Sequence, residues 1–293
     1  MKSAFNSSLI YLLFIAFIIS LSAESSAQDK LRVMSYNIRY DDKNESNTNS
    51  WKNRRELVAS VIRFHSPDII GVQEALLNQL EDLTAMLPDY KWIGVGRDDG
   101  NLSGEFSAVL YKHSEFKVLD YKTFWLSQTP DKVSMGWDAV CKRIITVSKI
   151  LRINPAKEFY FLNTHLDHVG IEARKNSASF IINLISELED IPLILTGDFN
   201  SLKDSDVYHI ITNSNEENNK IKLYDSEDKS VFYKYGSDIT YNGFSNELIP
   251  GNKIDYIFIN DKVEVIQHAV IGETFNGKFP SDHMPVVIDV ILK

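Results

Sequence analysis

Nine short runs of β-branched and aromatic residues recur along the chain, and they limit its fold more than any other feature. Such runs are typical of strands, and they occupy residues 31–38, 68–73, 91–96, 105–112, 143–153, 158–165, 192–197, 253–260 and 284–292. Helical periodicity appears between only some of them, around residues 57–62, at 76–87 and around 178–188. Strands that outnumber helices in this way predict an α+β fold of two packed sheets with helices outside.

Polar side chains stand in or at the ends of these runs, mostly near the C-terminal end of the strand. The residues concerned are Asn37, Glu74, His165, Asp198, Asn200, Asp255 and His283. Side chains at the tips of core strands share one rim of a domain and are held there by a rigid scaffold. The pattern therefore predicts a single functional site at that rim.

The stretch "PLILTGDFNS" (192–201) shows this arrangement most sharply. An aliphatic run stops at Gly197, which we expect to permit a tight turn, and Asp198 and Asn200 follow at once. A local Asx-turn would explain one of these two polar residues, but it explains both poorly. We therefore interpret the pair as functional.

The N-terminus predicts a secretory signal peptide over residues 1–27. Lys2 precedes the apolar run 9–19, and the small residues Ser25 and Ala27 follow it. The apolar run is short for a membrane-spanning helix, although an uncleaved anchor is the alternative. Cleavage would leave a single domain over residues 28–293, since no linker or repeat interrupts it, and would place the protein in the periplasm or outside the cell.

Charge and cysteine content narrow the possibilities further. The formal net charge of −9 argues weakly against a protein that grips long nucleic acid through many phosphate contacts. Cys141 is the only cysteine, so no disulfide can form within the chain, and a packing role is expected for it. We expect a monomer.

Six motifs occur in a fixed order along the chain: "MSYNIRY", "GVQEAL", "NTHLDH", "LTGDFNS", "KIDYIF" and "SDHMPV". Together they resemble the endonuclease/exonuclease/phosphatase superfamily, which has the DNase I-like fold. The stretches "GEFSAVLY" and "FWLSQTPDKVSMGWDAVCKR" look like a secreted bacterial branch of it. The resemblance implies a four-layer α/β/β/α sandwich and a metal-dependent phosphoester hydrolase.

The residues themselves suit that chemistry. A phosphoester repels an attacking hydroxide, so hydrolysis needs a cation on the phosphoryl oxygens, hydrogen-bond donors and a base for water. Glu74 at a rigid strand end is the expected main ligand of Mg²⁺ or Mn²⁺. Asn37 would help to place the metal or the phosphate, and Asp282, by resemblance, reaches the metal site.

The other polar residues at the strand ends can supply acid–base groups. Asp198 can orient the attacking water, and Asn200 can donate to a phosphoryl oxygen. His165 and His283 would flank the phosphate as imidazolium groups, with Asp255 orienting His283. The base is either His283 or Asp198, and we favour His283.

Substrate contacts are expected from three further residues. Glu105 is placed near His165, Arg143 can bind a phosphate oxygen in bidentate fashion, and Tyr241 in "TYNGF" borders the site. Asp167 and His168 extend "NTH" to "NTHLDH", where they either shape substrate binding or are loop residues bonded to their neighbours. A zinc site formed by His165, Asp167 and His168 is an alternative by residue type, but the many oxygen ligands favour magnesium or manganese.

Several functions remain open at this point. A small, sugar-linked or lipid-linked phosphoester ranks above nucleic acid as the substrate, with nuclease activity as the runner-up. A metal-independent glycosidase using Glu74 and Asp198 leaves both histidines and Asn200 without a role. A non-catalytic binding module on the cell surface would be expected to lack some of the motif residues.

Overall fold

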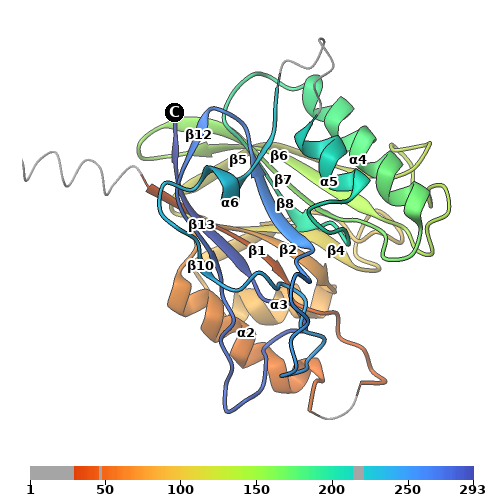
Figure 1. Ribbon diagram of the computed structural model, residues 1–293, viewed down its shortest axis with the longest axis vertical. Coiled ribbons are helices and arrows are strands. Elements are labelled where there is room, and N and C mark those ends of the chain that lie inside the picture. The colour runs from red at the N-terminus through yellow and green to blue at the C-terminus, as the bar shows by residue number, and fades with distance from the viewer. Residues whose placement is uncertain (1–29, 46–47, 214–220) are drawn as a thin grey trace, which may run out of the picture. The chain divides into compact units, whose positions relative to one another are not determined.

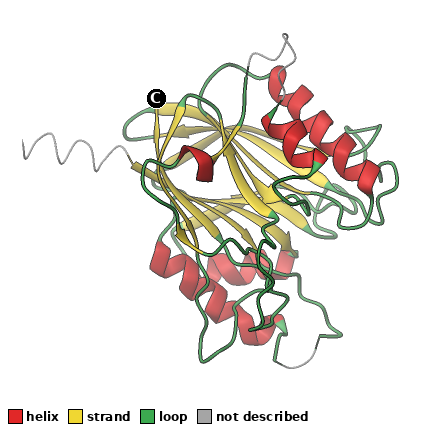
Figure 2. Cartoon of the chain, in the orientation of Figure 1, coloured by secondary structure: helices red, strands yellow, loops and turns green. Residues whose placement is uncertain are grey.

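Two mixed β-sheets face each other in the computed structural model, which describes residues 30–45, 48–213 and 221–293 (Figure 1, Figure 2). The strands of the first sheet are β1 (Lys30–Asn37), β2 (Ile69–Ala75), β3 (Tyr90–Ile93), β4 (Phe106–Lys112), β10 (Tyr235–Gly236), β12 (Val263–Val270) and β13 (Val286–Leu292). They lie in the order β10-β12-β13-β1-β2-β4-β3. The C-terminal strand thus sits inside the sheet, next to the first one.

The second sheet contains β5 (Phe116–Trp125), β6 (Ile144–Arg152), β7 (Lys157–His165), β8 (Leu193–Asp198), β9 (Tyr224–Asp225) and β11 (Asp255–Ile259). Their order is β5-β6-β7-β8-β11-β9. The pairs β1–β2 and β7–β8 are parallel, while β2–β4 and β8–β11 are antiparallel. Each of the nine strands predicted from the sequence therefore corresponds to an observed strand.

Helices cover the outer faces of both sheets. The helices are α2 (Trp51–His65) and α3 (Leu77–Met86) on the first sheet, α4 (Ile171–Ser186) and α5 (Asp206–Thr212) on the second, and the short α6 (Ser226–Lys229). Figure 1 shows the resulting order of layers, helix, sheet, sheet, helix. The predicted α+β fold, a four-layer α/β/β/α sandwich, is confirmed.

Alternating strand side chains build three apolar layers. Val33 of β1 points between the sheets, where it joins Phe161 and Ile194 in one core cluster. Met34, its neighbour, belongs to another cluster, in which it lies with Ile62 of α2. Because both faces of the central strands are buried, their sequences read as nearly continuous apolar runs.

Two long strands escaped the sequence analysis for the same physical reason. β5 forms an edge of its sheet, and most of its side chains are exposed or half-buried, including charged ones. β12 alternates buried residues with polar ones such as Glu264 and Gln267. An apolar run is the signature of a strand buried on both faces, and neither of these strands is buried in that way.

A buried polar network joins the two sheets behind the strand tips. Asn163 of β7 reaches across, and its Nδ2 donates to the backbone oxygens of Val72 (2.9 Å) and Ala108 (2.8 Å) in the first sheet. Its Oδ1 accepts from Gln73 Nε2 (2.6 Å) and Thr196 Oγ1 (3.1 Å). One amide thus satisfies groups from both sheets and fixes how they sit against each other.

We expect Asn163→Leu to lower the free energy of unfolding by about 2–4 kcal/mol, because it leaves buried polar groups without this partner. Urea unfolding monitored by circular dichroism measures the loss. Asn176→Ala on α4, whose side chain bonds only to the backbone of its own helix, is the matched control and should shift stability by less than about 0.5 kcal/mol. An unchanged midpoint for Asn163→Leu would contradict a structural role for the network.

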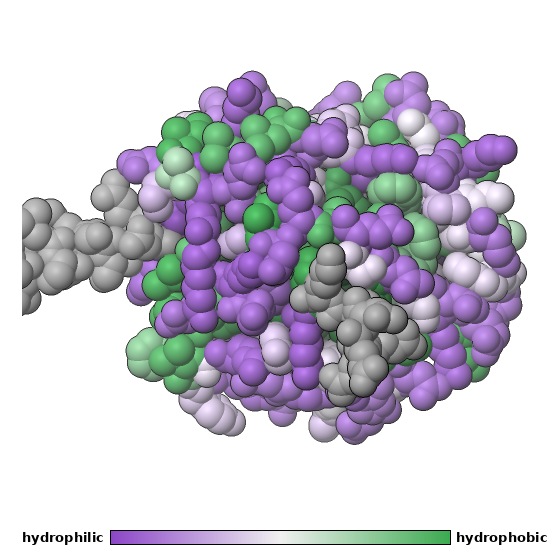
Figure 3. Space-filling model, turned by 90° about the horizontal axis from the view of Figure 1, so that it is seen from above, coloured by the Kyte–Doolittle hydropathy of each residue, from purple (hydrophilic) through white to green (hydrophobic). Residues whose placement is uncertain are grey.

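Residues Leu31–Lys293 form one compact unit. Among the described residues, no helix is both long and apolar enough to cross a membrane. The face drawn in Figure 3 is mainly hydrophilic, with hydrophobic residues in small separate groups. The predicted signal peptide, residues 1–27, lies outside the described residues and stays a prediction.

Candidate active site

Side chains from the ends of both sheets line one cavity of about 540 Å³. The predicted site residues in its lining are Glu74, Glu105, Arg143, His165, Asp198, Asn200, Tyr241, Asp282 and His283. The other two, Asn37 and Asp255, lie directly behind and hydrogen-bond to lining residues. The structure therefore brings together every residue that the sequence placed at the site.

Strand pairing explains why residues far apart in the sequence meet here. β7 and β8 are parallel neighbours, and their registers place His165 beside Asp198. β11 runs antiparallel to β8, so its first residue, Asp255, also lies opposite Asp198. Asp255 thus opens its strand rather than ending it, and His283 precedes β13. The strands of Asp255 and His283 therefore begin at this rim, whereas β7 and β8 end at it.

The tip of β8 differs from the prediction in one respect. Gly197 lies within the strand, and a Cβ there would come within 2.6 Å of the backbone oxygen of Thr164. Its absence of a side chain permits the close approach of β7, so the turn prediction for Gly197 is wrong. The turn is made by Asn200, whose φ is 47°, a conformation that asparagine tolerates better than most residues.

Asp198 makes the local Asx-type hydrogen bond and also contacts the side chains of the site. Its Oδ1 accepts from the backbone N–H of Asn200 at 2.9 Å, which is the Asx-type bond considered as the alternative. Its Oδ2 accepts from Asn37 Nδ2 at 3.0 Å and faces both histidines of the site. The local bond holds one oxygen and thereby aims the other at the cavity.

Glu74 reaches the cavity through an irregularity in β2. Its φ is 63°, and the β2–β4 register shifts between Val72 and Ala75, as expected of a β-bulge that redirects a side chain. Glu74 is only 9% exposed; Oε1 accepts from Asn37 Nδ2 (3.0 Å) and Oε2 from the backbone N–H of Tyr40 (3.1 Å). A strained backbone position of this kind is a common feature of functional sites.

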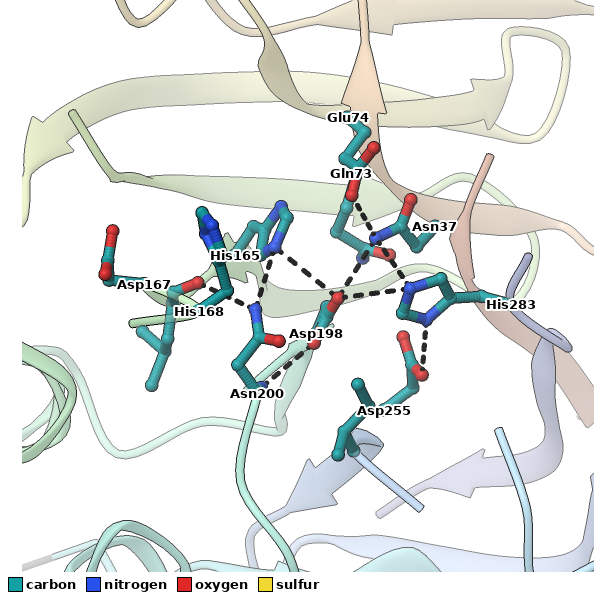
Figure 4. A network of polar contacts seen from close by, with 12 residues as sticks. Asn37, Gln73, Glu74, His165, Asp167, His168, Asp198, Asn200, Asp255 and His283 are labelled. Atoms are coloured by element: carbon teal, nitrogen blue, oxygen red, sulfur yellow. Dashed lines mark hydrogen bonds and ion pairs between the residues drawn. The ribbon is translucent and has the colours of Figure 1, made fainter. Parts of the chain in front are cut away.

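Asn37 links the two sheets within the site. Its Nδ2 donates to Glu74 from the first sheet and to Asp198 from the second, as the dashed lines in Figure 4 show. Its Oδ1 accepts from the backbone N–H of Arg39 at 3.0 Å. In this structure Asn37 therefore positions two carboxylates, while the metal or phosphate contact expected of its oxygen stays a prediction.

His283 is held between two carboxylates. Its Nδ1 lies 2.9 Å from Asp255 Oδ2, and its Nε2 lies 3.7 Å from Asp198 Oδ2 (Figure 4). Burial opposes the charged form, but Asp255 and Asp198 raise the pKa of His283 well above its usual value. Burial and the negative charge of Asp255 raise the pKa of Asp198 to about 7. Near neutral pH, the imidazole of His283 is thus expected to be protonated, while the carboxylate of Asp198 is expected to be able to accept a proton.

His165 has a different environment from His283. Its Nε2 accepts from Asn200 Nδ2 at 3.1 Å, and Asn200 Nδ2 also donates to the backbone oxygen of Leu166. Burial and the guanidinium of Arg143 lower the pKa of His165 well below its usual value. These pKa directions favour the imidazolium form at His283 and the neutral form at His165, whose ring Asn200 holds in place.

Arg143 and Glu105 lie on the side of the cavity beyond His165. Glu105 forms a bidentate ion pair with Arg97, at 2.6 and 2.7 Å. The side chain of Arg143 is 5% exposed; its Nε lies 3.5 Å from Asp167 Oδ2, and its Nη2 donates to His168 Nδ1 at 2.9 Å. The guanidinium of Arg143 is thus fixed from behind and presented to the cavity.

Sequence analysis missed two arginines of the cavity lining. Arg39 lies 3.8 Å from both Glu74 Oε2 and Asp282 Oδ2, and it follows Asn37 by two residues within "MSYNIRY", so the motif did contain it. Arg97 stands in an irregular loop before β4. Nothing in the local sequence distinguishes Arg97 from a solvated surface arginine.

Tyr241 borders the site as predicted. Its backbone pairs with that of His283, and its ring meets the imidazole edge to face with centroids 5.0 Å apart. The residue is 38% exposed. It therefore covers His283 on one side while remaining accessible from the cavity.

The donor set around Glu74 and Asp282 suits a hard cation. Both are buried carboxylates, and Asn37, Arg39 and above all His283 keep the pKa of Glu74 below its usual value despite burial. Oxygen ligands of this kind are those that Mg²⁺ and Mn²⁺ prefer. The residues present therefore fit the predicted divalent metal.

Three groups of side chains have ligand atoms within 4.8 Å of one another in the described part of the chain. They are Glu74, His165 and Asp198; Asp198, Asp255 and His283; and Cys141, Asp167 and His168. The zinc set considered from the sequence, His165 with Asp167 and His168, is not among these groups. Arg143 lies against both Asp167 and His168, so its positive charge opposes a cation there.

Comparison with known proteins gives consistent matches over nearly the whole described chain. The model of the Endonuclease/Exonuclease/phosphatase family matches residues 34–283. A solved endonuclease/exonuclease/phosphatase of Bacteroides vulgatus is 40% identical, with a TM-score of 0.83, and the match covers 90% of this chain and 99% of that one. The mannosyl-6-phosphatase Bt3783 of Bacteroides thetaiotaomicron is 35% identical, with a TM-score of 0.83 and coverage of 89% and 100%. Protein L388 of Acanthamoeba polyphaga mimivirus is 30% identical over 258 residues, which are 81% of this chain and 91% of that protein.

Proposed function

Because the chain belongs to the endonuclease/exonuclease/phosphatase family and is a phosphoester hydrolase, we propose that it works with a bound divalent metal ion. Water attacks phosphorus in line with the departing alcohol. Mg²⁺ is the proposed ion, with Mn²⁺ as a substitute. The proposed site is the 540 Å³ cavity described above.

One observation carries this proposal: carboxylates, imidazoles and guanidinium groups from both sheets converge on that cavity through direct hydrogen bonds. Asn37 ties Glu74 to Asp198, and Asp255 ties His283 to the same centre. Glycosidase chemistry needs Glu74 and Asp198 as independent acid and nucleophile, whereas here one amide bridges them. Phosphoryl transfer uses every member of the set.

Glu74 and Asp282 would hold the metal, with Asn37 behind them. When bound, a divalent ion supplies positive charge to the phosphoryl oxygens, which lowers the barrier to attack by water. Arg39 lies against both carboxylates and limits their mutual repulsion. The pKa of Glu74 stays below its usual value, whereas burial and the negative charge of Glu74 raise the pKa of Asp282, and a bound cation would offset that repulsion.

Asp198 is the proposed base. Its raised pKa, about 7, lies near neutral pH, which favours proton acceptance from a positioned water. His283, protonated and oriented by Asp255, donates through Nε2 to a phosphoryl or leaving oxygen. This assignment reverses the one favoured from the sequence, in which His283 was the base and Asp198 positioned the water.

Arg143 and the pair His165–Asn200 complete the pocket for the phosphoryl group. Arg143 is fixed by Asp167, so its remaining N–H groups can bind oxygens at little entropic cost. Asn200 keeps His165 in place. We therefore assign oxygen binding chiefly to Arg143, with His165 beside it.

The proposed substrate is a small phosphoester, with sugar-linked or lipid-linked esters ranked above nucleic acid. The net charge of −9 and the similarity to a protein described as a mannosyl-6-phosphatase support this order. Nuclease activity is the second candidate. Export through residues 1–27 to the periplasm or the medium, and action as a monomer, complete the proposal.

The test is hydrolysis of a panel of sugar phosphates, phosphodiesters, RNA and plasmid DNA by purified protein with and without metal. We expect EDTA to abolish turnover and Mg²⁺ or Mn²⁺ to restore it, with sugar phosphates leading the panel. Activity that survives exhaustive chelation would refute the metal requirement. Plasmid cleavage at enzyme concentrations too low for phosphatase activity would reverse the substrate order.

A further inference from the structure

Four residues on one side of the cavity have no task in the chemistry proposed above. Arg97, Glu105, Val140 and His168 line it together with Arg143. Figure 4 shows His168 and Asp167 on one side of His165, with His283 and Asp255 on the other. These five residues form the far wall. Arg143 borders the phosphoryl centre, and the other four lie beyond it, where the rest of a substrate must extend.

The acidic half of the far wall is held rigidly. Arg97 donates to both oxygens of Glu105, and its backbone N–H donates to the backbone oxygen of the same residue. The indole of Trp125 donates to the backbone oxygen of Arg97 at 2.8 Å. Each carboxylate oxygen has a second lone pair, so Glu105 can still accept two hydrogen bonds in a fixed orientation.

The basic half of the far wall is also held rigidly. Asp167 is almost fully buried, accepts from the backbone N–H groups of Val169 and Gly170, and lies 3.5 Å from Arg143 Nε. Arg143 donates to His168 Nδ1 at 2.9 Å. An arginine can only donate, so Nδ1 accepts and the proton of a neutral His168 is on Nε2. His168 is thus a fixed donor.

The charges on the far wall indicate which class of ligand it can bind. Glu105 and Asp167 lie against Arg97 and Arg143 and oppose their attraction for a second phosphate, although burial raises the pKa of Glu105 to about 7. The wall presents acceptors on Glu105 beside donors on His168 and Arg143, which is the pattern needed by neutral hydroxyl groups that both donate and accept. Val140, 53% exposed, adds an apolar surface suited to ring C–H groups.

We propose that the far wall recognises adjacent hydroxyl groups of a phosphorylated sugar, with Glu105 accepting from them and His168 donating to them. This inference rests on the proposed phosphoester hydrolysis, and it identifies the residues that choose the alcohol portion of the substrate. The cavity side concerned contains no Phe, Tyr or Trp among its described lining residues. The imidazole of His168 is the one ring that the described lining residues on this side offer to a nucleobase for stacking.

The test compares a hexose 6-phosphate with phenyl phosphate, which has no hydroxyl groups on its alcohol portion. We expect Glu105→Gln and His168→Ala each to lower kcat/KM for the hexose phosphate by about 10- to 100-fold, mainly through KM, because hydroxyl groups lose their partners. Phenyl phosphate should change by less than about threefold for Glu105→Gln. His168→Ala also frees Arg143 Nη2, so it should lower phenyl phosphate turnover as well, but by a factor about tenfold smaller than the loss on the hexose phosphate. His168→Gln, which retains a donor near Nε2, should recover part of the loss, and His113→Ala, an exposed histidine elsewhere, is the matched control.

Equal losses on both substrates, or no loss on either, would overturn the inference while leaving the hydrolase in place. So would a wild-type preference for a nucleoside monophosphate over the hexose phosphate. A different result, wild-type protein that hydrolyses neither ester in the presence of metal, would refute the proposed function itself. The two failures are therefore distinguishable in one set of assays.

Discussion

Replacing His283 by alanine should lower kcat/KM for a phosphoester by about 10³- to 10⁴-fold. The substitution removes the donor that faces the reacting centre and leaves two buried carboxylates, Asp255 and Asp198, without the cation between them. The loss of the donor acts on the transition state, so kcat should fall more than KM rises. Steady-state kinetics at saturating Mg²⁺ measures the change.

The pH profile separates this chemical role from a loss of folding. A protonated His283 is needed, so wild-type activity should fall as pH rises through its raised pKa. Asp255→Asn removes a negative charge that stabilises the imidazolium, lowers that pKa, and should move the alkaline limb to lower pH. His209→Ala, an exposed histidine on α5, is the control. A His283→Ala protein of near wild-type turnover would exclude the role.

Asp198→Asn should lower kcat by about 10²- to 10⁴-fold, the range typical for loss of a general base. The amide keeps the size of the side chain but cannot take a proton from water. In the wild-type enzyme, activity should fall as pH drops below about 7, the value to which burial and Asp255 raise the pKa of Asp198. The variant's residual activity should lack this acidic limb.

The control for Asp198→Asn is Asp131→Asn, which alters an exposed carboxylate paired with Lys122. It should leave kinetics within a factor of about two. Persistence of the acidic limb in Asp198→Asn would transfer the base role to another group, with His283 the next candidate. Thermal unfolding of both variants distinguishes kinetic losses from structural ones.

The central strands and the positions of the site residues were predictable because one physical cause produces both signals. A strand buried on both faces must be apolar throughout, so a carboxylate or an imidazole at its end stands out. β8 with Asp198 and β7 with His165 are the clearest cases. The fixed order of the six motifs then indicated that strands distant in the sequence contribute to one site.

What the sequence did not reveal depends on contacts formed only in three dimensions. The bulge at Glu74 and the turn at Asn200 are backbone features set by neighbouring strands. Gly197 was assigned to a turn because its real constraint, the carbonyl of Thr164, belongs to another strand. Arg97 becomes a site residue only through its ion pair with Glu105.

β13 lies between β12 and β1, and His283 stands just before it, separated only by Met284 and Pro285. A ribosome must therefore release β13, after all the other strands of both sheets, before an active centre can exist. Newly made chains stay inert towards phosphorylated metabolites until β13 docks between β12 and β1, and removal of this strand should silence the enzyme. The order of synthesis is thereby coupled to the onset of activity.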